Sequence, residues 1–68
     1  MFNIGGKLKK YRKRKNMSQD EFAQFLGISQ NYLSEIENDI YTPSLKKIAQ
    51  FAVKLNISVQ KLLSEKPE

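Results

Sequence analysis

The 68-residue chain contains no cysteine and no histidine. Without cysteine it forms no disulfide, so a domain this small must be held together by side-chain packing alone. Without either residue it has no thiol nucleophile, no side chain that ordinarily titrates near neutral pH and no usual set of transition-metal ligands. We therefore expect no enzymatic activity, no catalytic residue, no metal or other cofactor and no small-molecule ligand.

Long apolar runs are also absent. No segment approaches the roughly 20 apolar residues that cross a bilayer, and no apolar run follows the basic stretch near the N-terminus, as one would in a signal peptide. Nothing alternates with the period of a β-strand, and no repeat or linker divides the chain. These absences predict a cytoplasmic, all-α protein with a single domain over residues 1–68, ordered from about residue 4 to about residue 64.

Positive charge is concentrated near the N-terminus. Residues 7–15 hold seven of the 12 basic residues, whereas the rest of the chain holds five basic and seven acidic residues. The formal net charge is +5. Such asymmetry indicates a polyanionic partner, either nucleic acid or an anionic membrane surface. A solvated helix face is the simpler alternative.

Capping signals and apolar spacing predict five short helices. The first runs from about residue 6 to 15, with Leu8 and Tyr11 facing inward and its lysines facing outward. The second begins after Ser18, which forms an S-x-x-E capping box with Glu21, because each side chain then satisfies the backbone N–H of the other. This second helix is the best specified of the five.

A tight turn joins the second helix to the third. Gly27 ends the second helix, since a left-handed backbone conformation is needed there and glycine adopts it without steric cost. Ser29 caps the third helix, whose inner face carries Leu33 and Ile36. A loop of about three residues forces the two helices to cross sharply.

The last two helices follow a proline. Thr42 and Pro43 are expected to start the fourth helix, with proline at the first helical position, where its missing N–H costs nothing. A fifth, short helix opens at Ser58 and ends near Ser64, and residues 65–68 are expected to be frayed. The fourth helix carries a core stripe made of Leu45, Ile48, Phe51, Ala52 and Leu55.

Two short helices joined in this way are typical of a helix-turn-helix, whose second helix enters the DNA major groove. Amides of Gln and Asn pair with adenine there, and Glu accepts from cytosine. The first turn of the third helix reaches deepest into the groove, so Gln30 and Asn31 are expected to be the main base-reading residues. An ordinary solvated helix face is the alternative. The candidate base-reading residues are Gln30, Asn31, Ser34 and Glu35.

Candidate phosphate contacts surround this helix. Backbone N–H groups at a helix N-terminus favour anions. Phosphate contacts are therefore expected at Gln19 and Ser29, at the starts of the second and third helices. Two side chains flank the far end of the third helix, and three lysines of the first helix add diffuse attraction, with solubility as their alternative role. The candidates are Gln19, Ser29, Asn38, Tyr41, Lys9, Lys10 and Lys13.

Glu37 requires a positive partner, because a carboxylate at a helix C-terminus opposes the helix dipole. Together the motifs resemble the Cro/repressor-type (Xre-like) helix-turn-helix family over about residues 6–63: K-L-K-K-Y-R at 7–12, M-S-Q-D-E-F-A-Q-F-L-G-I-S at 17–29, L-S-E-I-E at 33–37 and P-S-L at 43–45. The resemblance implies a compact five-helix, lambda-repressor-like DNA-binding domain with a buried ion pair between Arg12 and Glu37. It also implies the phosphate and base contacts assigned to Gln19, Asn38, Gln30, Asn31 and Glu35.

Two positions depart from the family pattern. Asp39 stands where the family usually has glycine, and Asp tolerates the left-handed region better than most residues. Phe25 occupies a place that is usually polar, either as a partner contact or as an extra core residue. The stretches 32–34 and 57–63 resemble, more faintly, the DNA-binding half of SinR-type repressors.

These features predict a sequence-specific transcriptional regulator, most simply a repressor, or the DNA-binding part of a longer one. We expect a homodimer on a palindromic operator in double-stranded DNA, with half-sites roughly 34–36 Å apart. The dimer surface is assigned to the fifth helix and the end of the fourth, around Val59 and Leu63.

The main alternative is an antitoxin-like or other protein-interaction module that uses the same fold. Phe25, Tyr32 and Tyr41 would then form the contact patch. Membrane-surface binding by the first helix is disfavoured, because Leu8 and Tyr11 are too few to make an inserting apolar face.

Overall fold

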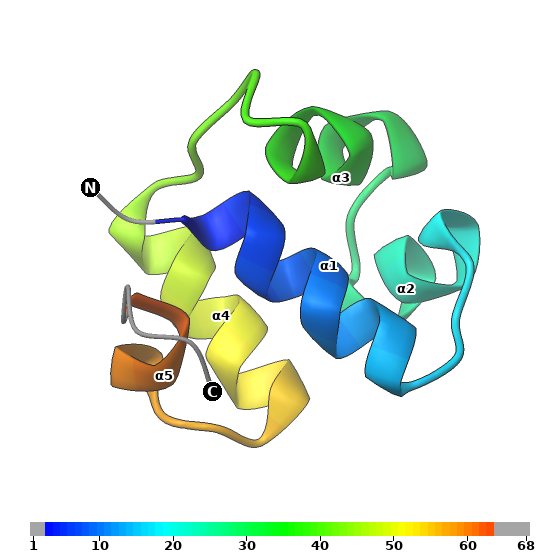
Figure 1. Ribbon diagram of the computed structural model, residues 1–68. Helices are drawn as coiled ribbons and strands as arrows, with labels where there is room; N and C mark the ends of the chain where they lie inside the picture. Colours follow the sequence, from blue (N-terminus) through cyan, green and yellow to red (C-terminus); the bar gives the residue numbers. More distant parts are fainter. Residues whose placement is uncertain (1–2, 64–68) are drawn as a thin grey trace.

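The computed structural model describes residues 3–63, which form five helices and no strand (Figure 1). The helices are α1 (Ile4–Arg14), α2 (Gln19–Leu26), α3 (Gln30–Glu37), α4 (Leu45–Leu55) and α5 (Val59–Leu63). The predicted all-α, five-helix fold is therefore confirmed. The expected helix end near Ser64 and the fraying of residues 65–68 lie outside the described residues.

The start of α1 lies two residues before the predicted one. Asn3 is the N-cap, and its side-chain Oδ1 accepts a hydrogen bond from the Gly6 backbone N–H at 3.0 Å. The earlier start places Ile4 in the first turn, where it is buried in the core. Gly5 lies inside the helix because α1 approaches α3 closely there, and a Cβ at this position would collide with the carbonyl oxygen of Ile36.

The expectation that all lysines of α1 face outward is wrong for Lys7. Ile4, Lys7, Leu8 and Tyr11 have the i, i+3, i+4, i+7 spacing of one helix face. Because Leu8 of this face is fully buried, Lys7 is buried beside it, with 8% of its surface exposed. The aliphatic stem of lysine makes such a position tolerable.

The α2–α3 unit agrees with the sequence prediction. The Ser18 hydroxyl accepts from the Glu21 backbone N–H at 3.1 Å, and the Glu21 carboxylate accepts from the Ser18 N–H at 2.9 Å. Gly27 ends α2 at φ 79°, in the left-handed region. The Ser29 hydroxyl accepts from the Tyr32 N–H at 3.1 Å and so caps α3. The turn therefore comprises residues 27–29.

Two predictions about α4 are wrong. Pro43 precedes the helix, because Ser44 is the cap and its hydroxyl accepts from the Lys47 N–H at 3.2 Å. Leu45 was assigned to the core stripe, yet it is 64% exposed, because it lies on the side of the first turn of α4 opposite to the core. The rest of the stripe is buried as predicted, with Ile48, Phe51, Ala52 and Leu55 in the core.

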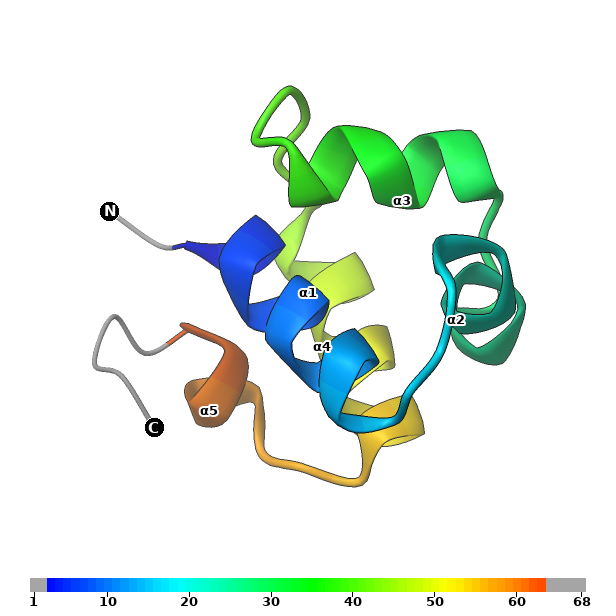
Figure 2. The ribbon, with the colours of Figure 1, turned by 45° about the vertical axis from the view of Figure 1, so that its right-hand side comes forward.

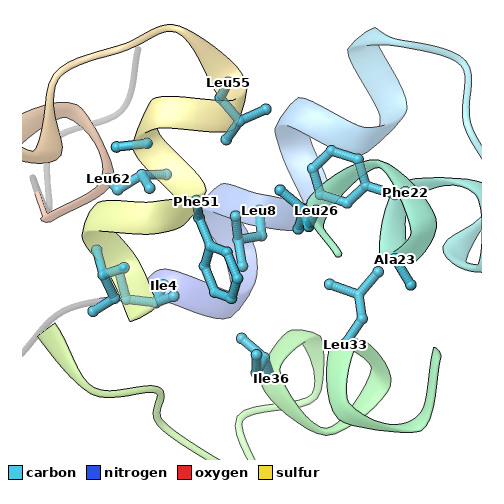
Figure 3. Packing of buried hydrophobic residues seen from close by; sticks show 12 residues of the cluster. Ile4, Leu8, Phe22, Ala23, Leu26, Leu33, Ile36, Phe51, Leu55 and Leu62 are labelled. Atoms are coloured by element: carbon cyan, nitrogen blue, oxygen red, sulfur yellow. The ribbon is translucent and has the colours of Figure 1, made fainter. Parts of the chain in front are cut away.

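The core is formed by side chains from all five helices, which point into one interior (Figure 3). Leu8 of α1, Phe22 of α2, Leu33 of α3, Phe51 of α4 and Leu62 of α5 are each at most 1% exposed. α3 packs against α1 and α2 and lies along one edge of the molecule (Figure 2). Among the described residues, no helix is long and apolar enough to cross a membrane.

Candidate nucleic-acid interface

One face of α3 is left uncovered. Leu33, Ile36 and Glu37 are its buried residues, so the opposite arc points away from α1 and α2. Asn31 and Glu35 lie in the middle of this arc, one helical turn apart, and both are exposed. Gln30 is also exposed, and Ser34 is half-buried at the margin. Asn31 and Glu35 thus share one accessible arc, with Ser34 at its margin, whereas Gln30 is accessible because it lies in the first turn of α3.

The polar side chains at the two ends of α3 form hydrogen bonds within the chain. At the start, the Ser29 hydroxyl is occupied by the Tyr32 N–H. At the end, the side-chain amide of Asn38 donates to the carbonyl oxygen of Ser34 at 2.9 Å and to its hydroxyl at 3.3 Å. Asn38 thus closes the last turn of α3. Phosphate contacts by Ser29 and Asn38 stay predictions.

Arg12 and Glu37 form a two-pronged ion pair between α1 and α3. The arginine Nε donates to Glu37 Oε2 at 2.9 Å, and Nη2 donates to Oε1 at 3.1 Å. The side chains are 13% and 2% exposed. Arg12 Nη1 also donates to the carbonyl oxygen of Met17, at 3.1 Å, in the α1–α2 loop. This pair supplies the cation that a carboxylate at the end of α3 requires.

Gln19 is joined to the same carboxylate. Its amide nitrogen donates to Glu37 Oε1 at 3.0 Å, so the first residue of α2 is tied to the last residue of α3. Sequence reasoning assigned Gln19 to phosphate contact and missed this bond, because no local pattern relates residues 18 positions apart. The side chain holds the two helices together, while its backbone N–H stays at the start of α2.

The loop after α3 folds back along that helix. Asp39 adopts the left-handed conformation expected of it, at φ 60°. The backbone N–H groups of Ile40 and Tyr41 both donate to the Glu35 carbonyl oxygen, at 2.9 and 3.2 Å. The ring of Tyr41 then packs on Tyr32, with 5.3 Å between centroids. Burial, and secondarily the neighbouring Tyr41, raise the pKa of the Tyr32 hydroxyl above its usual 10.0.

Phe25 extends the core at the surface of α2. It is half-buried and stacks on Phe22, with ring centroids 5.9 Å apart and planes 15° apart. The Lys15 ammonium lies 4.9 Å from the centre of the Phe25 ring, which is within the range of a cation–π interaction. Of the two roles expected for Phe25, the structure thus shows intramolecular packing against the core.

The helix-turn-helix itself carries negative charge. Residues 16–45 contain five acidic residues and no basic residue. The lysines proposed as phosphate contacts all lie on α1, where Lys9 and Lys13 are exposed and Lys10 is half-buried. Within residues 3–63 no group of three or more acidic side chains is placed to hold a metal ion.

Comparison with known proteins assigns this arrangement to a family. The family model described as helix-turn-helix matches residues 8–62. The HTH-type transcriptional regulator SinR of Bacillus licheniformis is 41% identical over 66 residues, which are 96% of this chain and 60% of SinR. The ImmF control region 10 kDa protein of Bacillus phage phi105 is 41% identical over 59 residues, covering 87% of this chain and 66% of that protein.

A solved structure shows the same fold. The structure of SinR, described as the master regulator for biofilm formation, in complex with DNA superimposes with a TM-score of 0.79 at 37% identity. The match covers 90% of this chain and 98% of that one. The chain spans about 60% of the length of the curated SinR relative.

Proposed function

The chain belongs to the helix-turn-helix family, and on that basis we propose that it is a transcriptional regulator, acting as a repressor, that binds double-stranded DNA sequence-specifically. One observation carries the proposal: α3 follows a three-residue turn and keeps a polar arc that no described residue covers. The relatives support it, since SinR is a transcriptional regulator and has been solved with DNA.

We place α3 in the major groove. A helix with its side chains is about 10–12 Å across, which matches the roughly 12 Å width of the groove. Gln30 and Asn31 enter deepest because they lie in the first turn, and their amides suit the N6 and N7 edge of adenine. Glu35 accepts from the cytosine amino group, and the Ser34 hydroxyl contacts a base at the margin.

Phosphate contacts fix the register of the helix and carry no base information. We assign them to the N-termini of α2 and α3, at Gln19 and Ser29, and to Asn38 and Tyr41 beyond the far end of α3. Since residues 16–45 hold no cation, the ionic attraction comes from α1. Its contributors are Lys9, Lys10 and Lys13.

A single α3 reads few base pairs, so we propose a homodimer on a palindromic operator. Half-sites about one helical turn apart, roughly 34–36 Å, would face two copies of α3. Val59 and Leu63 of α5, which are partly buried against the core, remain the proposed contact region. We place this activity in the cytoplasm, and we assign the chain no enzymatic activity and no cofactor.

Selection of bound duplexes from a random DNA pool tests the proposal. We expect one enriched sequence with twofold symmetry and half-site centres about 10 base pairs apart. An enriched site without symmetry would contradict the dimer alone. Failure to enrich any sequence at low salt would contradict DNA reading, and would favour the antitoxin-like alternative, in which Tyr32 and Tyr41 contact a protein.

A further inference from the structure

A second uncovered surface lies on α4. Leu45, Ala49 and Val53 follow one another at i, i+4 and i+8, so they form a continuous stripe along the helix. Leu45 is 64% exposed, Val53 is 78% exposed and Ala49 is half-buried. We call these three residues the α4 outer stripe. The core needs none of them, because α4 presents Ile48, Phe51, Ala52 and Leu55 to the interior.

Positive charge accompanies the α4 outer stripe. Lys46 and Lys54 are exposed on the same helix, Lys47 is half-buried, and the exposed Gln50 lies between them. Residues 40–63 contain four lysines and no acidic residue. The lysines of α4 therefore have no acidic neighbour in the sequence within residues 40–63.

The stripe is separate from the proposed base-reading side chains. α4 packs against α2 and α5, and in Figure 1 it runs from the left of the molecule down and away from α3, which lies at the top. The side chains assigned to base reading all belong to α3. A ligand on α4 is therefore compatible with DNA on α3.

We propose that the α4 outer stripe docks an acidic amphipathic helix of a partner protein. The apolar side of such a helix covers Leu45, Ala49 and Val53, and its flanking carboxylates meet Lys46 and Lys54. In helix–helix recognition of this kind, the apolar contact provides affinity and the flanking charges provide specificity for the partner. The stripe is short, so the contact belongs to the weak, transient class of interfaces.

Charge complementarity favours this occupant over a second copy of the chain. A twofold contact uses the same patch on both subunits. Pairing two α4 helices would bring the lysines of both copies into one interface, with no carboxylate between residues 40 and 63 to balance them. Repulsion between these like charges disfavours a dimer formed through α4.

The test uses the ¹⁵N- and methyl-labelled chain and a synthetic 16-residue helical peptide with leucines at i, i+4 spacing and glutamates beside them. We expect the signals of Leu45, Ala49 and Val53 to shift and saturate, while those of Gln30 and Asn31 stay in place. A peptide with lysine at every glutamate position is the charge control. Equal binding of the two peptides, or no shift at millimolar peptide, overturns the proposal.

Variants sharpen the result without disturbing the core. Val53→Asp, at an exposed position, should weaken binding of the acidic peptide at least about tenfold. Gln24→Glu adds a negative charge at an exposed position of α2 and should leave the peptide's affinity unchanged. Lys46→Glu/Lys54→Glu should reverse the preference between the two peptides. Val53→Asp should select the same DNA sequence as the unaltered chain does, so failure of this proposal and failure of DNA binding are distinguishable.

Three results would assign the stripe to another occupant and overturn the proposal. The first is dimerisation in analytical ultracentrifugation that Val53→Asp abolishes, which indicates a second copy. The second is binding to anionic phospholipid vesicles without binding of the acidic peptide. The third is a shift of the Leu45 and Val53 signals by DNA alone.

Discussion

Arg12 and Glu37 are 25 positions apart in the sequence, yet they meet through two hydrogen bonds of 2.9 and 3.1 Å. The carboxylate is almost fully buried and also accepts from Gln19. One side chain at the end of the proposed reading helix therefore contacts both α1 and α2.

Removing the arginine should destabilise the fold strongly. Arg12→Ala leaves the Glu37 carboxylate buried without its cation, a situation that costs about 3–5 kcal/mol. Urea denaturation gives the free energy of unfolding. Arg14→Ala is the matched control, since it removes the same charge from an exposed position of α1. Equal stabilities of the two variants would contradict a structural role for the pair.

A methyl group at position 5 should not be tolerated. Ala favours a helix interior over Gly by about 1 kcal/mol, but the Gly5→Ala methyl would meet the Ile36 carbonyl oxygen. We expect a net loss of about 1–3 kcal/mol, as for an overpacked core. Gly6→Ala should cost less, because its methyl meets only the Asn3 side chain, whose displacement loses the N-cap bond of α1, at about 1 kcal/mol. Thermal unfolding that ranks the two variants in the opposite order would refute the close α1–α3 approach.

Truncation of the first turn of α3 should relax sequence recognition. Gln30→Ala or Asn31→Ala should each cost about 1–3 kcal/mol on the selected operator and almost nothing on random DNA. Fluorescence anisotropy with both duplexes measures the difference. Gln50→Ala, an exposed glutamine on α4, should leave both affinities unchanged. If Gln30→Ala behaves in the same way as Gln50→Ala, the base-reading assignment of Gln30 is wrong.

Salt should weaken DNA binding only moderately. The slope of log K against log salt concentration is about −0.9 per phosphate neutralised, and the proposed ionic contacts are three lysines of α1. We expect the slope of log K against log salt concentration to be about −3 per subunit. Lys13→Ala should reduce its steepness by about one unit and weaken all sequences alike. A slope that Lys13→Ala leaves unchanged would remove this lysine from the contact set.

Stability should depend on Tyr32 in alkaline solution. The raised pKa means that the folded state binds the hydroxyl proton more tightly than the unfolded chain. This contribution is fully present below about pH 10 and is lost as pH rises through the folded pKa. Above about pH 10 the unfolding free energy of the unaltered chain should therefore fall more steeply than that of Tyr32→Phe. Parallel curves for the two proteins would show that Tyr32 does not contribute.

Local signals made much of the fold predictable. The capping box of Ser18 and Glu21 and the left-handed Gly27 lie within a few residues of one another in the sequence, and short-range chemistry determines both. The start of α4 was mispredicted because two caps compete there. Pro43 suits a first helical position, yet the Ser44 hydroxyl reaches the Lys47 N–H.

Features that depend on distant segments were less accessible to sequence reasoning. Burial of Lys7 and exposure of Leu45 depend on which other helix covers each face. The bond from Gln19 to Glu37 joins residues that only the folded chain brings together. Asn31 and Glu35 were recognisable because their exposure follows from helical spacing around Leu33 and Ile36. Contacts to bases depend on a molecule outside the chain.

The shared carboxylate also limits how the recognition unit can be moved between proteins. Residues 18–38 include both helices of the motif and Glu37, but they do not include Arg12. Transplanted alone onto a new scaffold, this fragment would carry an acid without a counterion into its host's interior. A successful graft needs the guanidinium that α1 supplies beneath the final turn of α3, so the smallest portable form of the proposed DNA-binding unit comprises α1, α2 and α3.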